Sequence, residues 1–202
     1  MVTEKNNPPI ILVCGRKNSG KTTLLEKLIP VLKQRGLQVA LIKHDRHGFD
    51  CDVEGTDSDR LRRAGAYGTI VVQGGHVFMN RYGETEPSLE ELAKAFPEAD
   101  LILAEGYKGM QLPKVELIRR ACFSEKEIKE KQIQPVSEKR GRFLIVTDFS
   151  AAEAESFGWR EERIGLEDIC LLAEGIQQKL QMNNCALSVP SKKQEAGKAE
   201  YK

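Results

Sequence analysis

A glycine-rich loop is the clearest chemical feature of the sequence. GRKNSGKT, residues 15–22, fits the pattern Gly-x4-Gly-Lys-Thr and directly follows the apolar run IILVC, residues 10–14. The glycines let the backbone turn sharply, so that successive N–H groups point at phosphate oxygens. In this pattern Lys21 reaches the β- and γ-phosphates, and the Thr22 hydroxyl ligates Mg²⁺. The loop therefore predicts a nucleoside triphosphate site made by Gly15, Asn18, Ser19, Gly20, Lys21, Thr22 and Thr23.

A second acidic group is needed in such a site to hold Mg²⁺ or the water bound to it. The stretch DLILAEG, residues 100–106, places Glu105 at the carboxyl end of an apolar run. This is an arrangement like a Walker B motif, and Glu105 is the candidate catalytic residue because it could meet the metal or orient an attacking water. The alternative is a solvated glutamate that only ends a core strand.

Residues 43–66 are dense in ionisable groups and poor in apolar ones. They follow the second expected strand, where many P-loop proteins carry a mobile switch region. Asp50 and Asp52 could reach Mg²⁺, and we take Asp50 as a metal ligand together with Thr22 and Glu105. Basic side chains of the segment could meet phosphate. These are Lys43, Arg60, Arg62 and Arg63.

The same segment offers alternatives. His44, His47 and Cys51 suggest a transition-metal site, but three candidate ligands without a fourth make a weak metal motif. A solvated loop with ordinary charges is the other alternative. The residues predicted to meet a substrate or partner are Lys43, His44, His47, Asp52 and Arg62.

Asp148 is a candidate for reading the nucleotide base. The stretch VTDFS, residues 146–150, follows a late strand at the place where P-loop GTPases carry Asn-Lys-x-Asp. Only the aspartate is present here. Its carboxylate could accept from N1 and N2 of guanine, and it could equally well cap a helix.

Alternating strands and helices must position these groups. Periodicity and turn residues predict strands at 10–15, 37–43, 100–105, 114–118 and 142–148, and a hairpin that turns at Gly74-Gly75. Expected helices are 19–35 with an irregularity at Pro30, 58–66 capped by Asp57 or Ser58, 89–96, a short solvated helix between residues 124 and 141, and 166–180.

This alternation predicts an α/β fold of the P-loop NTPase type, a three-layer sandwich with a mostly parallel central sheet. Ligands of such sheets bind at the carboxyl ends of the strands, where the glycine-rich loop falls. We expect a flexible N-terminus at 1–9, a single P-loop nucleotide-binding domain at 10–182 and a polar, disordered tail at 183–202.

Composition excludes several classes of protein. The chain has 202 residues, 40% of them hydrophobic and 30% charged, which is typical of a globular domain. No apolar run reaches the length of a membrane span, and the N-terminus lacks the apolar core of a signal peptide. Five scattered cysteines without CxxC pairing favour reduced thiols in a cytoplasmic protein. A net charge of +1 gives no general attraction to nucleic acid or to a membrane surface.

Five blocks of the sequence together resemble protein B of molybdopterin-guanine dinucleotide biosynthesis, a GTP-binding adaptor family of molybdenum cofactor maturation. In family order and spacing they cover most of residues 10–120. They are SGKTTLLEKLIP, LIKHDRHGFDCD, DSDRLRRAGA, DLILAEGYK and PKVELIRR. The sequence departs from the family at three positions, where Arg46, Glu54 and Thr56 stand in place of the usual histidine, proline and lysine.

The resemblance implies a P-loop domain, often a homodimer, that binds GTP with Mg²⁺ and hydrolyses it weakly at most. It also implies two further partners, molybdopterin and the guanylyltransferase that joins GMP to it. Two other classes share a P-loop. A small-molecule kinase would need an arginine-rich lid, for which Arg60, Arg62 and Arg63 could serve. A metallochaperone GTPase usually shows a histidine-rich stretch, whereas this chain has three histidines.

Overall fold

The computed structural model describes residues 7–45, 48 and 52–187. Its centre is a six-stranded sheet in the order β2-β5-β1-β6-β7-β8, in which every pairing is parallel. The strands are β1 (Ile10–Gly15), β2 (Val39–Lys43), β5 (Leu101–Glu105), β6 (Lys114–Ile118), β7 (Arg142–Thr147) and β8 (Glu162–Gly165). The predicted α/β fold with a parallel central sheet is confirmed, and β8 is a strand that the sequence did not predict.

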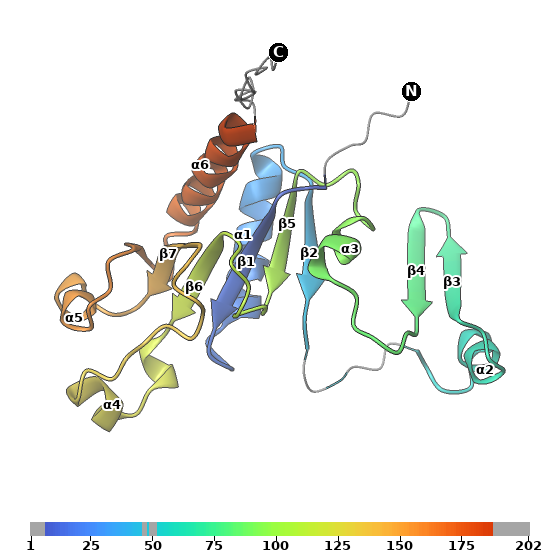
Figure 1. Ribbon diagram of the computed structural model, residues 1–202, viewed down its shortest axis with the longest axis horizontal. Helices are drawn as coiled ribbons and strands as arrows, with labels where there is room; N and C mark the ends of the chain where they lie inside the picture. The colour runs from blue at the N-terminus through green and yellow to red at the C-terminus, as the bar shows by residue number, and fades with distance from the viewer. Residues whose placement is uncertain (1–6, 46–47, 49–51, 188–202) are drawn as a thin grey trace, which may run out of the picture.

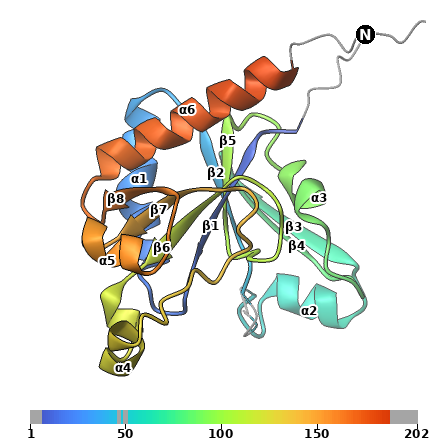
Figure 2. The same ribbon diagram turned by 60° about the vertical axis from the view of Figure 1, so that its left-hand side comes forward.

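Helices cover both faces of this sheet, which makes three layers (Figures 1 and 2). On one face, α1 (Lys21–Gln34) and α6 (Ile169–Leu187) pack with alternate residues of the inner strands in one apolar cluster. The other face carries α3 (Leu89–Ala93) and α5 (Ala151–Ser156), which belong to two smaller clusters. None of the helices in the described ranges combines the length and apolarity needed to cross a membrane.

The ends of several helices differ from the prediction. Helix α1 continues through Pro30 and ends at Gln34. Helix α6 begins at Ile169 and continues through Leu187, past the start of the predicted tail at 183. Two short helical segments follow β6: a 3₁₀ turn at Arg120–Cys122 and the expected solvated helix, α4 (Glu125–Lys129), with Ser124 as its cap.

The predicted hairpin is confirmed. Strands β3 (Gly68–Gln73) and β4 (His76–Arg81) pair antiparallel around Gly74-Gly75 and form a separate two-stranded sheet. Figure 1 shows this hairpin and α2 (Asp57–Arg63) extending to one side of the central sheet. The predicted cap of α2 was wrong. Its N-cap is Thr56, which has extended backbone geometry and whose hydroxyl accepts the N–H of Asp59.

Candidate functional site

The glycine-rich loop joins β1 to α1 in a backbone path that requires glycine at two positions. At Gly15 a Cβ atom would lie 2.6 Å from the Leu117 carbonyl oxygen, closer than real Cβ atoms approach. Gly20 has a φ of 89° and is the N-cap of α1, to which no side-chain cap contributes. The first N–H groups of the helix are therefore open to an anion, as the phosphate-binding pattern requires.

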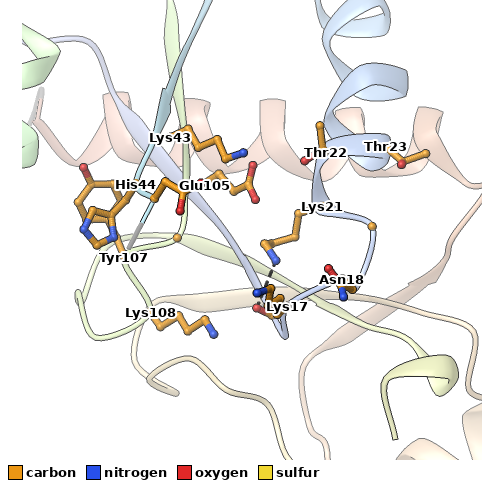
Figure 3. Close-up of a pocket in the computed structure, with 14 residues that line it drawn as sticks. Lys17, Asn18, Lys21, Thr22, Thr23, Lys43, His44, Glu105, Tyr107 and Lys108 are labelled. Atoms are coloured by element: carbon orange, nitrogen blue, oxygen red, sulfur yellow. Dashed lines mark hydrogen bonds between the residues drawn. The ribbon is translucent and has the colours of Figure 1, made fainter. Parts of the chain in front are cut away.

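A cavity of about 500 Å³ opens beside this loop at the carboxyl edge of the sheet (Figure 3). It brings together the loop and the residues that follow β2 and β5. Its lining is Gly15, Lys17, Asn18, Gly20, Lys21, Thr22, Thr23, Lys43, His44, Asp45, Glu105, Gly106, Tyr107 and Lys108. The predicted loop residues thus share one cavity, except for Ser19, whose side chain is fully buried inside the turn.

Lys21 holds its ammonium group within the loop. The Nζ atom donates to the Arg16 carbonyl oxygen at 2.8 Å and lies 3.5 Å from that of Gly15 (Figure 3). Burial lowers the pKa of Lys21, and the nearby Glu105 carboxylate opposes this shift by favouring the charged form. A phosphate anion would also favour the ammonium form, for the same electrostatic reason.

Glu105 lies where the sequence placed it. It is the last residue of β5, opposite Val13 of the loop-bearing strand on one side and Lys43 of β2 on the other. Only 9% of it is exposed. Figure 3 shows its side chain in the cavity with Thr22 and Lys21. Mg²⁺ commonly uses one or two protein oxygens together with substrate phosphates and water, and Thr22 and Glu105 provide such a pair.

Two residues after β5 were missed as site residues by the sequence analysis. Tyr107 and Lys108 line the cavity, and the backbone reaches them through Gly106 with a φ of 108°. The Tyr107 ring lies 5.1 Å from that of His44, measured between centroids. The signal was present in the stretch EGYK, because a glycine directly after a Walker-B-like strand allows the chain to turn across the site.

The charged segment after β2 divides into two parts. Lys43 and His44 line the cavity, and His44 Nε2 lies 3.2 Å from the Glu86 carboxylate. Asp52 and Arg62 do not line it. The Asp52 carboxylate accepts from the Ser58 hydroxyl at 2.7 Å, and Arg62 donates to Asp59 at 2.6 Å. The predicted residues His47 and Asp50, and Cys51 with them, lie outside the described residues.

A small-molecule kinase would need an arginine-rich lid, and a metallochaperone would need a cluster of metal ligands. The guanidinium groups of Arg60, Arg62 and Arg63 form ion pairs with Asp57, Asp59 and Glu54 in and beside α2, and none of them lines the cavity. Within residues 7–45, 48 and 52–187, no three His, Cys, Asp or Glu side chains gather as metal ligands would.

Asp148 follows β7, two strands away from β1 in the sheet order. Its carboxylate accepts the backbone N–H of Arg120 at 2.6 Å, and it does not line the cavity beside the loop. The Asp148 carboxylate thus contacts the backbone of the 3₁₀ turn after β6. The helix that follows Asp148, α5, has Ser150 as its N-cap, so Asp148 does not cap it.

Comparison with known proteins identifies the family of the chain. A family model described as molybdopterin guanine dinucleotide synthesis protein B matches residues 10–138. The molybdopterin-guanine dinucleotide biosynthesis adapter proteins of Haemophilus influenzae and Escherichia coli are 39% and 42% identical over 57% and 55% of the chain. Each match spans 66% of the relative's own length.

Solved structures show the same fold. A crystal structure of Bacillus subtilis MobB has a TM-score of 0.59 and 26% identity, and covers 83% of this chain and 97% of that one. The structure of a MobB homolog from Bacillus stearothermophilus has a TM-score of 0.57 and 21% identity, and covers 86% of this chain and 98% of that one.

Proposed function

Because the chain belongs to the molybdopterin guanine dinucleotide synthesis protein B family, we propose that it binds GTP with Mg²⁺ and assists formation of the molybdopterin-guanine dinucleotide. It would act as an adaptor to the guanylyltransferase that joins GMP to molybdopterin, and would hydrolyse GTP slowly at most. The observation that carries this proposal is the single cavity that joins the glycine-rich loop to Glu105 and to the residues after β2.

The charges of this cavity suit a triphosphate bound with a metal ion. Four ammonium groups line it, from Lys17, Lys21, Lys43 and Lys108, in addition to the N-terminus of α1. We assign the loop amides and Lys21 to the β- and γ-phosphates. Thr22 and Glu105 would hold Mg²⁺ or its bound water, and Glu105 would orient the attacking water during hydrolysis.

The other half of the cavity is where we place contact with the second ligand or the partner. His44 and Tyr107 present neighbouring rings there, and Lys43 and Lys108 present cations. Molybdopterin offers a fused heteroaromatic ring and a phosphate, which these two kinds of group can recognise by stacking and by charge. The adaptor role is thus supported by one cavity with two different sets of groups.

We further propose that the protein is a homodimer joined through the β3–β4 hairpin. Large apolar side chains on this hairpin are exposed, including Ile70 at 64%, Val72 at 62%, Val77 at 66% and Met79 at 59%. An exposed apolar surface of this kind marks an interaction site. A second copy of the hairpin offers the same apolar residues and free strand edges, so the surface is self-complementary in chemistry.

The decisive experiment is recovery of ligands from the purified protein. After incubation with GTP, Mg²⁺ and molybdopterin, the protein should retain both ligands through gel filtration, and it should bind the guanylyltransferase. The Lys21→Ala variant should lose the nucleotide. The Lys33→Ala variant is the control and should retain it, because Lys33 lies in the last turn of α1, away from the loop. A parent protein that binds no triphosphate would contradict the proposal.

A further inference from the structure

A second cavity lies behind the glycine-rich loop. Its volume is about 220 Å³, and it is lined by Ser19, Gly20, Thr23, Leu24, Lys27, Leu117, Arg119, Leu166 and Glu167. Gly20 and Thr23 line both this cavity and the phosphate cavity. A nucleotide whose phosphates occupy the first cavity can therefore extend its nucleoside past Thr23 into the second.

The lining of this cavity suits a flat heteroaromatic ring. Leu24 of α1, Leu117 of β6 and Leu166 after β8 supply apolar walls. Polar groups lie at its edge, where Lys27 donates to the Glu167 carboxylate at 2.6 Å. Apolar walls with a few placed polar groups are typical of small-molecule sites, whereas phosphate needs a polar lining.

Arg119 lines this cavity and offers a hydrogen-bond donor to a ligand. Its Nε atom is buried and makes no hydrogen bond within the described part of the chain. Its Nη1 atom lies beside the loop, 3.1 Å from the position a Cβ atom would take at Gly20. The guanidinium therefore sits near the positive N-terminus of α1, where an acceptor supplied by a ligand would relieve both the unpaired donor and the local positive charge.

Guanine supplies the matching acceptors. Its O6 and N7 atoms accept from an arginine in a bidentate contact, and its N2 amino group is a donor. Adenine presents an amino group in place of O6, so it offers Arg119 a donor where an acceptor is needed. Glu167 could accept from the guanine amino group at the rim of the cavity.

We propose that this second cavity is the guanine subsite and that Arg119 is its specificity-determining residue, an inference that rests on the proposed binding of GTP. Asp148 then has a positioning role, because its carboxylate holds the backbone of Arg120, the residue next to Arg119. This division explains why the Asp148 carboxylate is engaged by the protein while the Arg119 Nε is not.

Calorimetric titration with GTP, ATP and inosine triphosphate tests this assignment. The parent should prefer GTP to ATP. Arg119→Gln should lower the affinity for GTP by roughly tenfold, because a bidentate contact with O6 and N7 is lost. It should not lower the affinity for ATP, since glutamine can pair with N6 and N7 of adenine. Glu167→Leu should make the affinities for GTP and inosine triphosphate alike, since these nucleotides differ only in the amino group and leucine has no acceptor for it. Arg120→Gln is the matched control, because its side chain pairs with Glu153 and does not line the cavity.

Three results would overturn the inference. Equal losses of GTP and ATP affinity in Arg119→Gln would make the residue a phosphate contact. Loss of discrimination in Asp148→Asn, with discrimination intact in Arg119→Gln, would return the reader role to Asp148. Equal affinities of the parent for GTP and ATP would remove base reading altogether. Failure of the proposed function is distinct, because in that case the parent would bind no triphosphate at all.

Discussion

The central sheet and the β3–β4 hairpin contain similar apolar residues, but these are buried in the sheet and exposed in the hairpin. Every residue of β5 is buried, and β1 is buried from Ile11 onward. In β3, by contrast, only Thr69 is not exposed, although Ile70, Val71 and Val72 would suit a core strand. Isolated two-stranded hairpins are at best marginally stable in water, so the hairpin gains from being covered, whereas the inner strands of the sheet are already covered within one chain.

This difference separates two tasks. The phosphate cavity is built entirely from elements of the central sheet and the segments that follow them. The hairpin contacts mainly α2, and the salt bridges of α2 stay within the α2 region. We expect nucleotide binding to respond to changes at the sheet edge, and self-association to respond to changes on the hairpin.

The largest effect should come from Lys21→Ala at the sheet edge. Charge-assisted contacts of this kind contribute about 1.5–3 kcal/mol, so affinity for GTP should fall about tenfold to hundredfold. The fold should persist, because among the described residues the ammonium group donates only to carbonyl oxygens of its own loop. Fluorescent GTP analogue titration and sedimentation should show lost binding with unchanged association. If Lys21→Ala lost both GTP binding and self-association, the two tasks could not be assigned to separate regions.

The reciprocal change is Ile70→Lys on the hairpin. Ile70 pairs with Met79 across the hairpin and is 64% exposed, so a lysine costs the monomer little. Placing its charge in an apolar interface should weaken the dimer by about thirtyfold, the scale of a 2 kcal/mol hot spot. Sedimentation should detect this while affinity for GTP stays unchanged. Leu171→Lys, at an exposed apolar residue of α6, is the matched control, and equal weakening by both would argue against the hairpin interface.

A smaller effect at the sheet edge should come from Glu105→Gln. The substitution is nearly isosteric but removes the charge that would hold Mg²⁺ or orient water. Hydrolysis should slow by at least tenfold, about 1.4 kcal/mol of transition-state stabilisation, while GDP affinity is spared. Single-turnover phosphate release, with and without Mg²⁺, is the measurement. A variant that hydrolyses GTP at the parent rate, with the same Mg²⁺ dependence, would reduce Glu105 to the end of a strand.

The parts that local pattern controls were predictable from sequence. The loop, its strand and the position of Glu105 follow from apolar periodicity and from glycine spacing. The hairpin turn followed from Gly74-Gly75, and its confirmation shows that turn chemistry acts locally. By contrast, β8 has only four residues, ERIG, and is a strand because it pairs with β7. Its formation depends on tertiary contact and not on its own sequence.

The site was predictable to the extent that its residues belong to motifs. Lys108 and Tyr107 enter the cavity because Gly106 turns the chain after β5, and the Walker-B-like pattern does not specify their side chains. Arg62 fitted a phosphate-binding role by charge alone, but the structure pairs it with Asp59. Charge counts cannot show which arginines are already neutralised by a neighbour one helical turn away.

The smallest effect should come from acid, and it should be confined to the α2 region. Asp59 is buried, and its carboxylate accepts the backbone N–H of Gly55 at 3.0 Å and donors of Arg63 and Arg62 at 2.9 and 2.6 Å. The Gly55 N–H and then the two guanidinium groups lower the pKa of Asp59 from its ordinary value of 3.8 to about 2. Because the folded pKa lies below the unfolded one, the stabilisation is complete above about pH 4 and is lost as the pH falls toward 2.

The protection of the α2 amides against hydrogen exchange, corrected for intrinsic rates, should therefore be constant from neutral pH to about pH 4 and should fall below that pH. Asp59→Asn should remove this dependence and lower protection at neutral pH, with no change in affinity for GTP. If the Asn variant instead weakened GTP binding, the α2 region would be coupled to the phosphate cavity, and the two regions could not be treated as separate.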